Sequence, residues 1–415
     1  MKRSDSTDRF NQLQSVSRHR TAPKAKAIHS MASSTVTLID ARGDAQAGSA
    51  AIADGSSHSL GPLTVRTQRL RGGRREGVLE VELVAGTTRV IVLPDRGLGL
   101  WKIFSGAIAL GWQSPVQGPV HPRHVPLAEP SGLGWLDGFD ELVARCGLVS
   151  NGAPDFDASG TLRHGLHGRI AHLPAHWLEV TLDDTAGTIT LKGAVDETRF
   201  LSHALLMTTT LTVDANRPRV QWTDAVTNLS DRPATMQMLY HINFGPPLLG
   251  AGAELVAAVE ELAPRNAAAV SDLSEWHQFV SPQAGRGEQV HFARLRPAGD
   301  GRATAMLVSP DKNHAAGVSW RTDTLPFFTL WKNQGGSADG YVAGIEPGTN
   351  FPNSRSFEES QGRVVPLSPR ESVSFDLAIE YLTGPAVAAQ RSRILAAGAG
   401  QPPTLHPRPR PDWSA

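Results

Sequence analysis

The sequence has very little cysteine and no excess charge of either sign. Cys146 is the one cysteine among 415 residues, which excludes an internal disulfide and is typical of a reducing compartment. Lysine and arginine together number 40, as do aspartate and glutamate, so no net charge attracts nucleic acid or an anionic membrane surface. We therefore expect a cytoplasmic protein without a nucleic-acid partner.

Long apolar runs and several familiar catalytic signatures are also missing. No stretch approaches the roughly 20 apolar residues that a membrane-spanning helix needs, so no membrane partner is expected. The chain contains no phosphate-binding loop, dinucleotide fingerprint, nucleophile elbow, HExxH motif or paired CxxC motif. We therefore predict no cofactor and no resident metal ion.

The first 55 residues differ in composition from the rest of the chain. They are rich in serine, arginine, alanine and aspartate, and they contain one short apolar run at residues 35–39 without sustained periodicity. We predict that residues 1–55 form a disordered N-terminal extension, with Met31 as an alternative natural start.

From about residue 60 onward, short segments alternate apolar and polar residues. Leu79, Val81 and Leu83, for example, alternate with glutamates, as on a strand with one buried face. Many such segments, punctuated by 40 glycines and 29 prolines, predict an all-β domain over residues 56–385, built as a large antiparallel sandwich or barrel. The clearest consecutive strand candidates are residues 205–214, 219–228 and 234–244.

Helical periodicity is scarce along the whole chain. Residues 386–397 are predicted to form a short helix. The final stretch, GQPPTLHPRPRPDWSA, is rich in proline, and we expect it to pack neither as a strand nor as a helix. Residues 386–415 are therefore treated as a terminal helix and tail outside the β domain.

Two histidines lie in segments whose glycines and prolines fix the backbone closely. His167 lies between Gly165 and Gly168 in LRHGLHGRI, and His241 precedes the exit at residues 245–247 in LYHINFGPP. Histidine is the side chain whose ordinary pKa allows it to give and take protons near neutral pH. Each residue is a candidate for acid–base chemistry or ligand binding, and a structural histidine is the alternative in both cases.

One glutamate and two arginines complete the candidate chemistry. Glu346 ends the apolar run 342–345, so burial should raise its pKa, as a general base near neutral pH requires. A structural salt bridge is the alternative for this glutamate. Arg96 and Arg169 are candidates to bind a sugar hydroxyl or a buried carboxylate.

Flat apolar side chains suited to stacking on sugar rings are also present. The candidates are Trp101, Trp112, Trp135 and Trp331, although most tryptophans serve only in the core. Trp331, the adjacent Lys332, and Asn243, which follows His241 by two residues, join the predicted substrate-binding set.

Two pairs of histidines offer a metal site as an alternative. His121 and His124 form one pair, and His164 and His167 form the other. Residues three apart do not share one face of a strand, so either pair would require a loop to bind a metal.

The motifs HGLHGR, LYHINFG and GIEPGTNFPNSR, in this order, resemble the galactose mutarotase-like (aldose 1-epimerase) superfamily. The segments LPDRGLGL and RCGL make the sequence most similar to a domain-of-unknown-function branch of that superfamily. The resemblance covers about residues 60–383. It implies a β-supersandwich of two large, mostly antiparallel sheets with a sugar site in an open cleft.

The resemblance also implies roles for individual residues. In mutarotases of this superfamily, a glutamate takes the proton of the anomeric hydroxyl while a histidine protonates the ring oxygen, and the ring opens and closes again on the other face. Position by position, Glu346 matches the base and His241 the acid. His167 matches a second histidine that binds hydroxyls, and Arg96 matches a hydroxyl-binding arginine. The family's aspartate for outer hydroxyls has no identified counterpart.

We therefore predict a carbohydrate-active isomerase of the aldose 1-epimerase type, acting on a small-molecule sugar as a monomer or homodimer. Two alternatives remain open. One is a carbohydrate-binding protein without catalytic activity, and the other is a metal-assisted sugar isomerase or lyase that uses the paired histidines.

Overall fold

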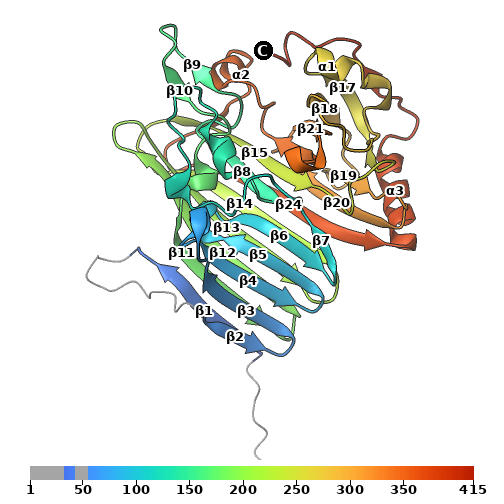
Figure 1. Ribbon diagram of the computed structural model, residues 1–415. Coiled ribbons are helices and arrows are strands. Elements are labelled where there is room, and N and C mark those ends of the chain that lie inside the picture. The colour runs from blue at the N-terminus through green and yellow to red at the C-terminus, as the bar shows by residue number, and fades with distance from the viewer. Residues whose placement is uncertain (1–31, 43–54) are drawn as a thin grey trace, which may run out of the picture. The chain divides into compact units, whose positions relative to one another are not determined.

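Two large, mostly antiparallel sheets make up most of the structure, because alternating apolar residues give each strand a face to bury (Figure 1). The computed structural model describes residues 32–42 and 55–415. The predicted all-β sandwich is confirmed. The first sheet has nine strands, in the order β1 (Ser33–Asp40), β11 (Ala175–Asp183), β12 (Thr188–Arg199), β13 (His203–Asp214), β14 (Arg219–Asn228), β24 (Ser372–Thr383), β20 (His314–Arg321), β19 (Arg302–Val308) and β16 (Glu254–Ala257).

The second sheet has 14 strands. Its main path is β2 (Ser57–Leu60), β3 (Leu63–Arg69), β4 (Leu79–Ala85), β5 (Thr88–Leu93), β6 (Gly99–Ser105), β8 (Val143–Leu148), β15 (Ala234–Phe244), β22 (Val342–Gly348), β21 (Phe327–Asn333), β18 (Gln289–Leu295), β17 (Val259–Pro264) and β25 (Thr404–Leu405). Off this path, β7 (Ile108–Leu110) pairs with β6 and β23 (Val365–Leu367) pairs with β15. A separate small sheet contains β9 (Asp155–Phe156) and β10 (Leu162–His164).

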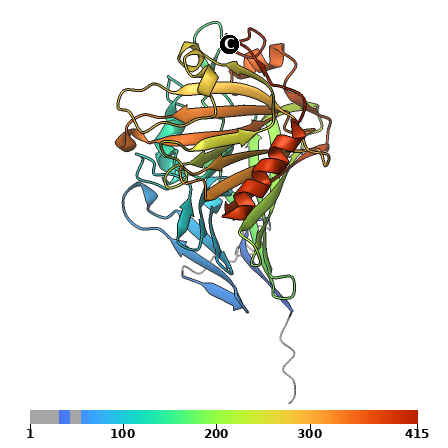
Figure 2. The ribbon, with the colours of Figure 1, turned by 90° about the vertical axis from the view of Figure 1, so that its right-hand side faces the viewer.

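Helices are short, as the scarcity of helical periodicity predicts. The α-helices are α1 (Ala267–Val270), α2 (Arg355–Ser360) and α3 (Pro385–Ala397). The 3-10 turns are η1 (Gly73–Arg75), η2 (Pro94–Arg96), η3 (Pro122–His124), η4 (Gly134–Gly138), η5 (Ile170–His172), η6 (Leu273–Glu275) and η7 (Ser337–Asp339). In the part of the chain that the structure describes, no helix is long and apolar enough to cross a membrane. Figure 2 shows α3 lying across strands of the nine-stranded sheet.

The main apolar core lies between the two sheets. Alternate side chains of β15 point into this core and away from it. Tyr240, Ile242 and Phe244 belong to this core, where burying each side chain contributes about 1.5–3 kcal/mol. Leu239 belongs to a separate apolar cluster on the opposite face. Because side chains alternate along a strand, His241 also points away from the main core.

A buried ion pair crosses the core and joins the two sheets. Arg145 of β8 donates to both oxygens of Asp224 on β14, at 2.6 and 3.0 Å. Thr209 and Tyr240 also donate hydroxyl hydrogen bonds to this carboxylate, at 2.6 and 2.9 Å. Removing one partner of such a pair typically costs about 3–5 kcal/mol, since the other charge is left buried. The pair therefore fixes β8, and with it the adjacent β15, against the nine-stranded sheet.

The prediction of disorder is wrong for part of the N-terminal segment. Residues 33–40 form β1, which pairs antiparallel with β11 at the edge of the nine-stranded sheet. The hydrogen bonds that order this segment come from a strand far along the chain, which local periodicity does not reveal. Residues 1–31 and 43–54, to which the prediction also applied, lie outside the described residues.

The prediction that the proline-rich tail forms neither a strand nor a helix is also wrong. Thr404 and Leu405 form β25, which runs parallel to β17. Trp413 is buried, and its ring centroid lies 4.8 Å from that of Phe351. Asn353 donates a 2.8 Å hydrogen bond to the Trp413 carbonyl. One large aromatic side chain therefore anchors a segment whose prolines prevent regular pairing.

We predict that Trp413→Ala lowers the free energy of unfolding by about 3 kcal/mol, because it empties a packed aromatic site. Chemical denaturation of the full chain measures this change. Arg408→Gln, at an exposed position of the same tail, is the control and should leave stability unchanged. Equal stability of the Trp413 variant and the wild type would contradict the observed packing.

Candidate functional site

The pairing of β15 with β22 sets a histidine and a carboxylate side by side. Ile242 pairs with Ile345 in an antiparallel register, which places His241 directly across from Glu346. Directly opposed residues project to the same face of a sheet. His241 Nε2 lies 3.1 Å from Glu346 Oε1, and both side chains are buried. The two residues predicted to exchange protons are therefore in contact.

A cavity of about 330 Å³ lies over this pair. Its volume is at the lower end of the range for small-molecule sites, about 300–1,000 Å³. The walls come from η4 and the turn after it, the loop around residue 167, and strands β15, β18, β21 and β22. The lining includes Trp135, Phe139, His167, His241, Arg265, Glu288, Trp331 and Glu346.

His167 faces His241 across the cavity, with ring centroids 5.3 Å apart. Its Nδ1 donates a hydrogen bond to the carbonyl of Asn151 at 2.9 Å, so Nε2 is left as the acceptor. Burial lowers the pKa of His167 to about 4, so the ring is neutral at neutral pH. A neutral imidazole held in this way accepts a hydrogen bond from a ligand hydroxyl.

The backbone around His167 explains why glycine follows it. His167 has a φ of 57°, in the left-handed region that non-glycine residues rarely adopt. Gly168 has a φ of 72°, and a Cβ there would lie 2.0 Å from the Ser150 carbonyl oxygen. Only glycine fits this position. Strained backbone of this kind costs about 1–3 kcal/mol per residue and is concentrated at functional sites.

Asn243 determines which nitrogen of His241 faces the glutamate. The Asn243 amide nitrogen donates to the Glu141 carbonyl at 3.0 Å, so its oxygen accepts from His241 Nδ1 at 2.6 Å. His241 Nε2 is therefore the nitrogen next to Glu346. The prediction that Asn243 binds substrate is not supported, since its side chain does not line the cavity and instead orients His241.

Burial shifts the pKa values of Glu346 and His241 in the directions that favour their uncharged forms. It raises the pKa of Glu346 well above its usual range, and the nearby Glu288 carboxylate adds to this rise. It lowers the pKa of His241 well below its ordinary value, and the neighbouring His167 is the second cause. The pair therefore shares one transferable proton between Glu346 and His241 Nε2, in addition to the Nδ1 proton that His241 donates to Asn243. Glu346 Oε1 also lacks a well-aligned hydrogen-bond partner among the described residues, as expected of a site that a ligand completes.

Aromatic rings surround the pair on three sides. The ring centroids of Phe139 and Trp331 lie 4.9 and 5.3 Å from that of His241. The Trp135 centroid lies 4.7 Å from that of His167. Trp331 is therefore at the cavity, as predicted, and Trp135 supplies a second flat wall. These rings exclude water and strengthen the electrostatic interactions of the pair.

Three other residues predicted to bind substrate lie elsewhere. Arg96 is buried, forms an ion pair with Glu141 and donates to the carbonyls of Val120 and Gly138, each at 2.8 Å. Its guanidinium group thus supports the turn behind the cavity, and the predicted contact with sugar is wrong.

Lys332 and Arg169 are also outside the cavity. Lys332 follows Trp331 on β21, so strand alternation directs it to the opposite face, where it forms an ion pair with Asp272. Arg169 is exposed and is not part of the lining. Proximity in sequence to a site residue was the misleading signal in both cases.

Two charged residues at the cavity were missed by the sequence analysis. Arg265 follows the end of β17, and its guanidinium group lies 3.9 Å from the Glu288 carboxylate. Glu288 accepts a 2.8 Å hydrogen bond from the Trp331 indole nitrogen. No motif marks either residue, because only the pairing of β18 with β17 and with β21 brings them to the cavity.

In the described part of the chain, the two histidine pairs considered as metal ligands do not belong to a group of three or more possible ligands. Over residues 32–42 and 55–415, no group of three or more His, Cys, Asp or Glu residues is arranged to hold a metal ion. His121 instead caps η3 by accepting from the backbone of Arg123 at 3.2 Å.

Comparisons with known proteins agree with this architecture. A family model described as a domain of unknown function (DUF4432) matches residues 75–381. A solved structure of a "putative aldose 1-epimerase" from Klebsiella pneumoniae subsp. pneumoniae matches with a TM-score of 0.86 and 29% identity, over 91% of this chain and 99% of that one. A "galactose mutarotase-like protein" from Clostridium acetobutylicum matches with a TM-score of 0.53 and 14% identity, over 78% and 100% of the two chains, and shows the fold alone. No curated protein matches the chain. The resemblance inferred from the motifs is confirmed.

We predict that Gly344→Ala separates Glu346 from His241 while leaving the fold intact. A Cβ at Gly344 would lie 2.2 Å from Glu346 Oε1, so the flexible carboxylate must move. A crystal structure of the variant should show a distance from Oε1 to His241 Nε2 well above 3.1 Å. Gly299→Ala, where a Cβ meets nothing within 4 Å, is the control. An unmoved carboxylate would contradict the described geometry.

Proposed function

The chain belongs to the DUF4432 family and has a galactose mutarotase-like fold, and from these premises we propose that it is a sugar isomerase of the aldose 1-epimerase type. The observation that carries the proposal is the contact between Glu346 and His241 inside a small-molecule-sized cavity. One buried carboxylate and one buried imidazole that share a proton are suited to moving protons between two oxygens of one sugar. The similar Klebsiella structure, described as a "putative aldose 1-epimerase", supports the same reaction class.

In the proposed reaction, the productive pair is an ionised Glu346 and a protonated His241. The carboxylate takes the proton of the anomeric hydroxyl while His241 Nε2 gives its proton to the ring oxygen. The bond from C1 to the ring oxygen breaks, and an aldehyde forms at C1. After rotation about the C1–C2 bond, the freed hydroxyl attacks the other face of C1, His241 takes its proton back, and Glu346 returns a proton to the aldehyde oxygen.

The pair holds one transferable proton throughout this sequence, and no electrons are gained or lost. Each positioned proton transfer contributes roughly 10²–10⁴-fold to the rate. The low dielectric of the cavity favours transfer, since the neutral state of the pair that follows ring opening avoids two buried charges. Burial thus favours the proton transfers of ring opening, while it disfavours the charged pair from which ring opening starts.

Other cavity residues are assigned to sugar binding in this proposal. His167 Nε2 accepts from a ring hydroxyl, since its Nδ1 is occupied by Asn151. Trp135 and Trp331 provide flat faces for the ring. Arg265 and Glu288 at the cavity supply a donor and an acceptor for outer hydroxyls, in place of the aspartate that has no counterpart in the motifs.

We predict that Glu346→Gln and His241→Ala each lower the rate of anomer interconversion by at least about 100-fold, since each removes one proton-transfer group. The measurement is exchange NMR or polarimetry of a panel of aldoses with the full chain. Arg169→Gln, an exposed change near the cavity, is the control and should keep the wild-type rate. Wild-type rates in the Glu346 variant would exclude the proposed base. Sugar binding by an otherwise inactive wild type would favour the carbohydrate-binding alternative.

The pH dependence follows from the directions of the pKa shifts. A pair with ordinary values would lose its shared proton as the pH rises above about 6.5, and activity would fall there. Here the last proton leaves only at the raised pKa of Glu346, so kcat/KM should not begin to fall at pH 6.5 as it would for a pair with ordinary pKa values. Activity should fall near pH 4, as His167 takes up a proton. A tenfold loss per pH unit above pH 6.5 would contradict the one-proton pair.

A further inference from the structure

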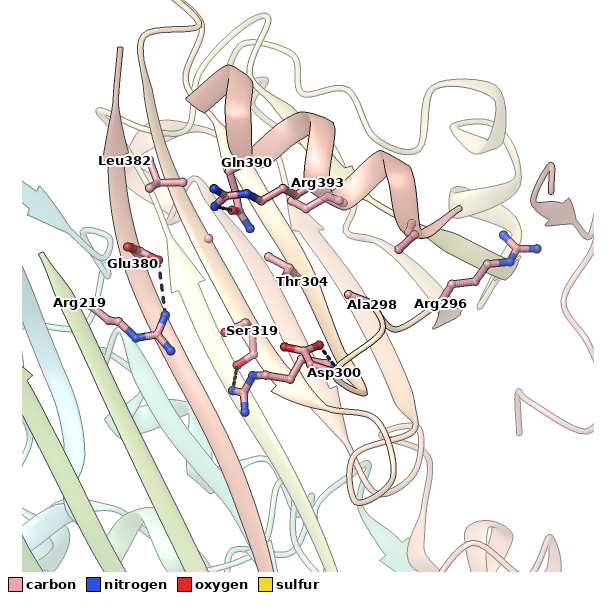
Figure 3. Close-up of a pocket in the computed structure, with 15 residues that line it drawn as sticks. Arg219, Arg296, Ala298, Asp300, Thr304, Ser319, Glu380, Leu382, Gln390 and Arg393 are labelled. Carbon is pink, nitrogen blue, oxygen red and sulfur yellow. Dashed lines mark hydrogen bonds and ion pairs between the residues drawn. The ribbon is translucent and has the colours of Figure 1, made fainter. Parts of the chain in front are cut away.

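A second hollow lies on the outer face of the nine-stranded sheet, beneath α3 (Figure 3). Its volume is about 290 Å³, more than an inorganic phosphate ion needs. The floor comes from β14, β24, β20 and β19, and one wall comes from α3. It belongs to a different sheet from the cavity of Glu346, and the proposed isomerase reaction does not use it.

The hollow is open above Gly317, because glycine has no side chain to fill it. Gly317 and Ser319 alternate along β20, as Arg302 and Thr304 do along β19, so all four project to the outer face. Gly317 has no positive φ that would demand glycine, and a Cβ there would meet nothing nearer than 3.9 Å. A glycine inside a strand without a local steric reason is typical of a place where a ligand approaches the backbone.

The side chains around the hollow carry more positive than negative charge. Arg219, Arg302 and Arg393 line it, and Figure 3 shows Arg296 directed away from the other labelled side chains. The carboxylate of Glu380 is 3.4 Å from Arg219 and compensates that charge.

Arg302 and Arg393 have no such compensation. In the described part of the chain, neither forms an ion pair with a carboxylate, although Asp300 accepts from the Arg302 backbone nitrogen at 3.0 Å. The Arg302 guanidinium group donates only to the carbonyls of Ser319 and Asp376, at 3.2 and 3.3 Å. Arg393 makes one long contact of 3.5 Å with Gln390. Both groups keep unused N–H donors, the type of group that binds phosphate oxygens in pairs.

The positive charge is also partly removed from water. Burial lowers the pKa of Arg302, and the neighbouring Arg219 adds to this effect through like-charge repulsion. The guanidinium group stays charged, because its pKa is far above neutral. The carboxylates of Asp376 and Asp300 offset part of the lowering. An anion in the hollow would meet a guanidinium group whose side-chain hydrogen bonds, among the described residues, go only to carbonyls.

The remaining lining is suited to a hydroxylated molecule. The Thr304 and Ser319 side-chain hydroxyls lie on the floor and form no hydrogen bond to another described residue. Gln390 on α3 and Glu380 on β24 add an amide and a carboxylate. Such groups are typical partners of sugar hydroxyls.

We propose that this hollow is a binding site for a small phosphorylated polyol or sugar. Its phosphate group is held by Arg302 and Arg393, with Arg219 adding longer-range attraction. Its hydroxyl groups contact Thr304, Ser319 and Gln390. The space over Gly317 accommodates the carbon chain.

Isothermal titration of the full chain with glucose 6-phosphate, glucose and inorganic phosphate tests this proposal. Glucose 6-phosphate should bind at this site, and more tightly than inorganic phosphate. Arg393→Gln and Arg302→Gln should each weaken that binding about 10- to 100-fold. Gly317→Leu should abolish it by filling the hollow while keeping every arginine. Arg199→Gln, an exposed arginine on β12, is the control with the same charge change and should keep the wild-type affinity.

Arg393 is exposed on α3, so its variant does not depend on refolding of the sheet and remains informative if the Gly317 variant is unstable. Absence of glucose 6-phosphate binding would overturn the proposal. Binding that persists in both the Arg393 and Gly317 variants would assign the ligand to another place and would also overturn it. Equal affinity for inorganic phosphate would overturn the role of the hydroxyl-binding floor.

Discussion

The antiparallel register between β15 and β22 is the constraint on which the candidate site depends. It sets His241 and Glu346 on the same face of neighbouring strands, 3.1 Å apart, without a loop to position either one. A shift of one residue in this register would turn one side chain into the main core. Because both groups are buried together, their pKa values move in opposite directions and the pair keeps one transferable proton. The geometry of two strands thus produces the histidine–carboxylate contact on which the proposed acid–base chemistry depends.

Two buried ion pairs hold this register in place. Arg145 and Asp224 link the two sheets, and Tyr240, the residue before His241, donates to the same carboxylate. On the other face, Arg96 and Glu141 support the turn that covers the cavity, and the Glu141 carbonyl accepts from Asn243. Buried charge is a poor source of net stability but is strongly destabilising when one partner is lost. These ion pairs therefore serve mainly to hold the neighbouring strands and turn in position, as Asn243 holds the ring of His241.

The local sequence pattern predicted the fold class and the residues at the centre of the site. Strand alternation and glycine-flanked histidines can both be recognised within short stretches of sequence. It failed where the decisive neighbour is distant. Arg265 and Glu288 reach the cavity only through strand pairing, β1 is ordered by β11, and Trp413 finds its packing site against Phe351. Lys332 was misplaced for a different reason, since adjacency to Trp331 does not say which face a side chain occupies. Arg96 was assigned to sugar through the family resemblance, and its guanidinium group instead pairs with Glu141.

The proposed function requires that an aldose binds with its reacting atoms between Glu346 and His241. A crystal structure of the protein with a bound aldose tests it most directly. The account predicts the anomeric oxygen within about 2.6–3.2 Å of the Glu346 carboxylate and the ring oxygen within the same reach of His241 Nε2. A sugar bound with its anomeric carbon directed away from both residues, or bound outside this cavity, would contradict the claim.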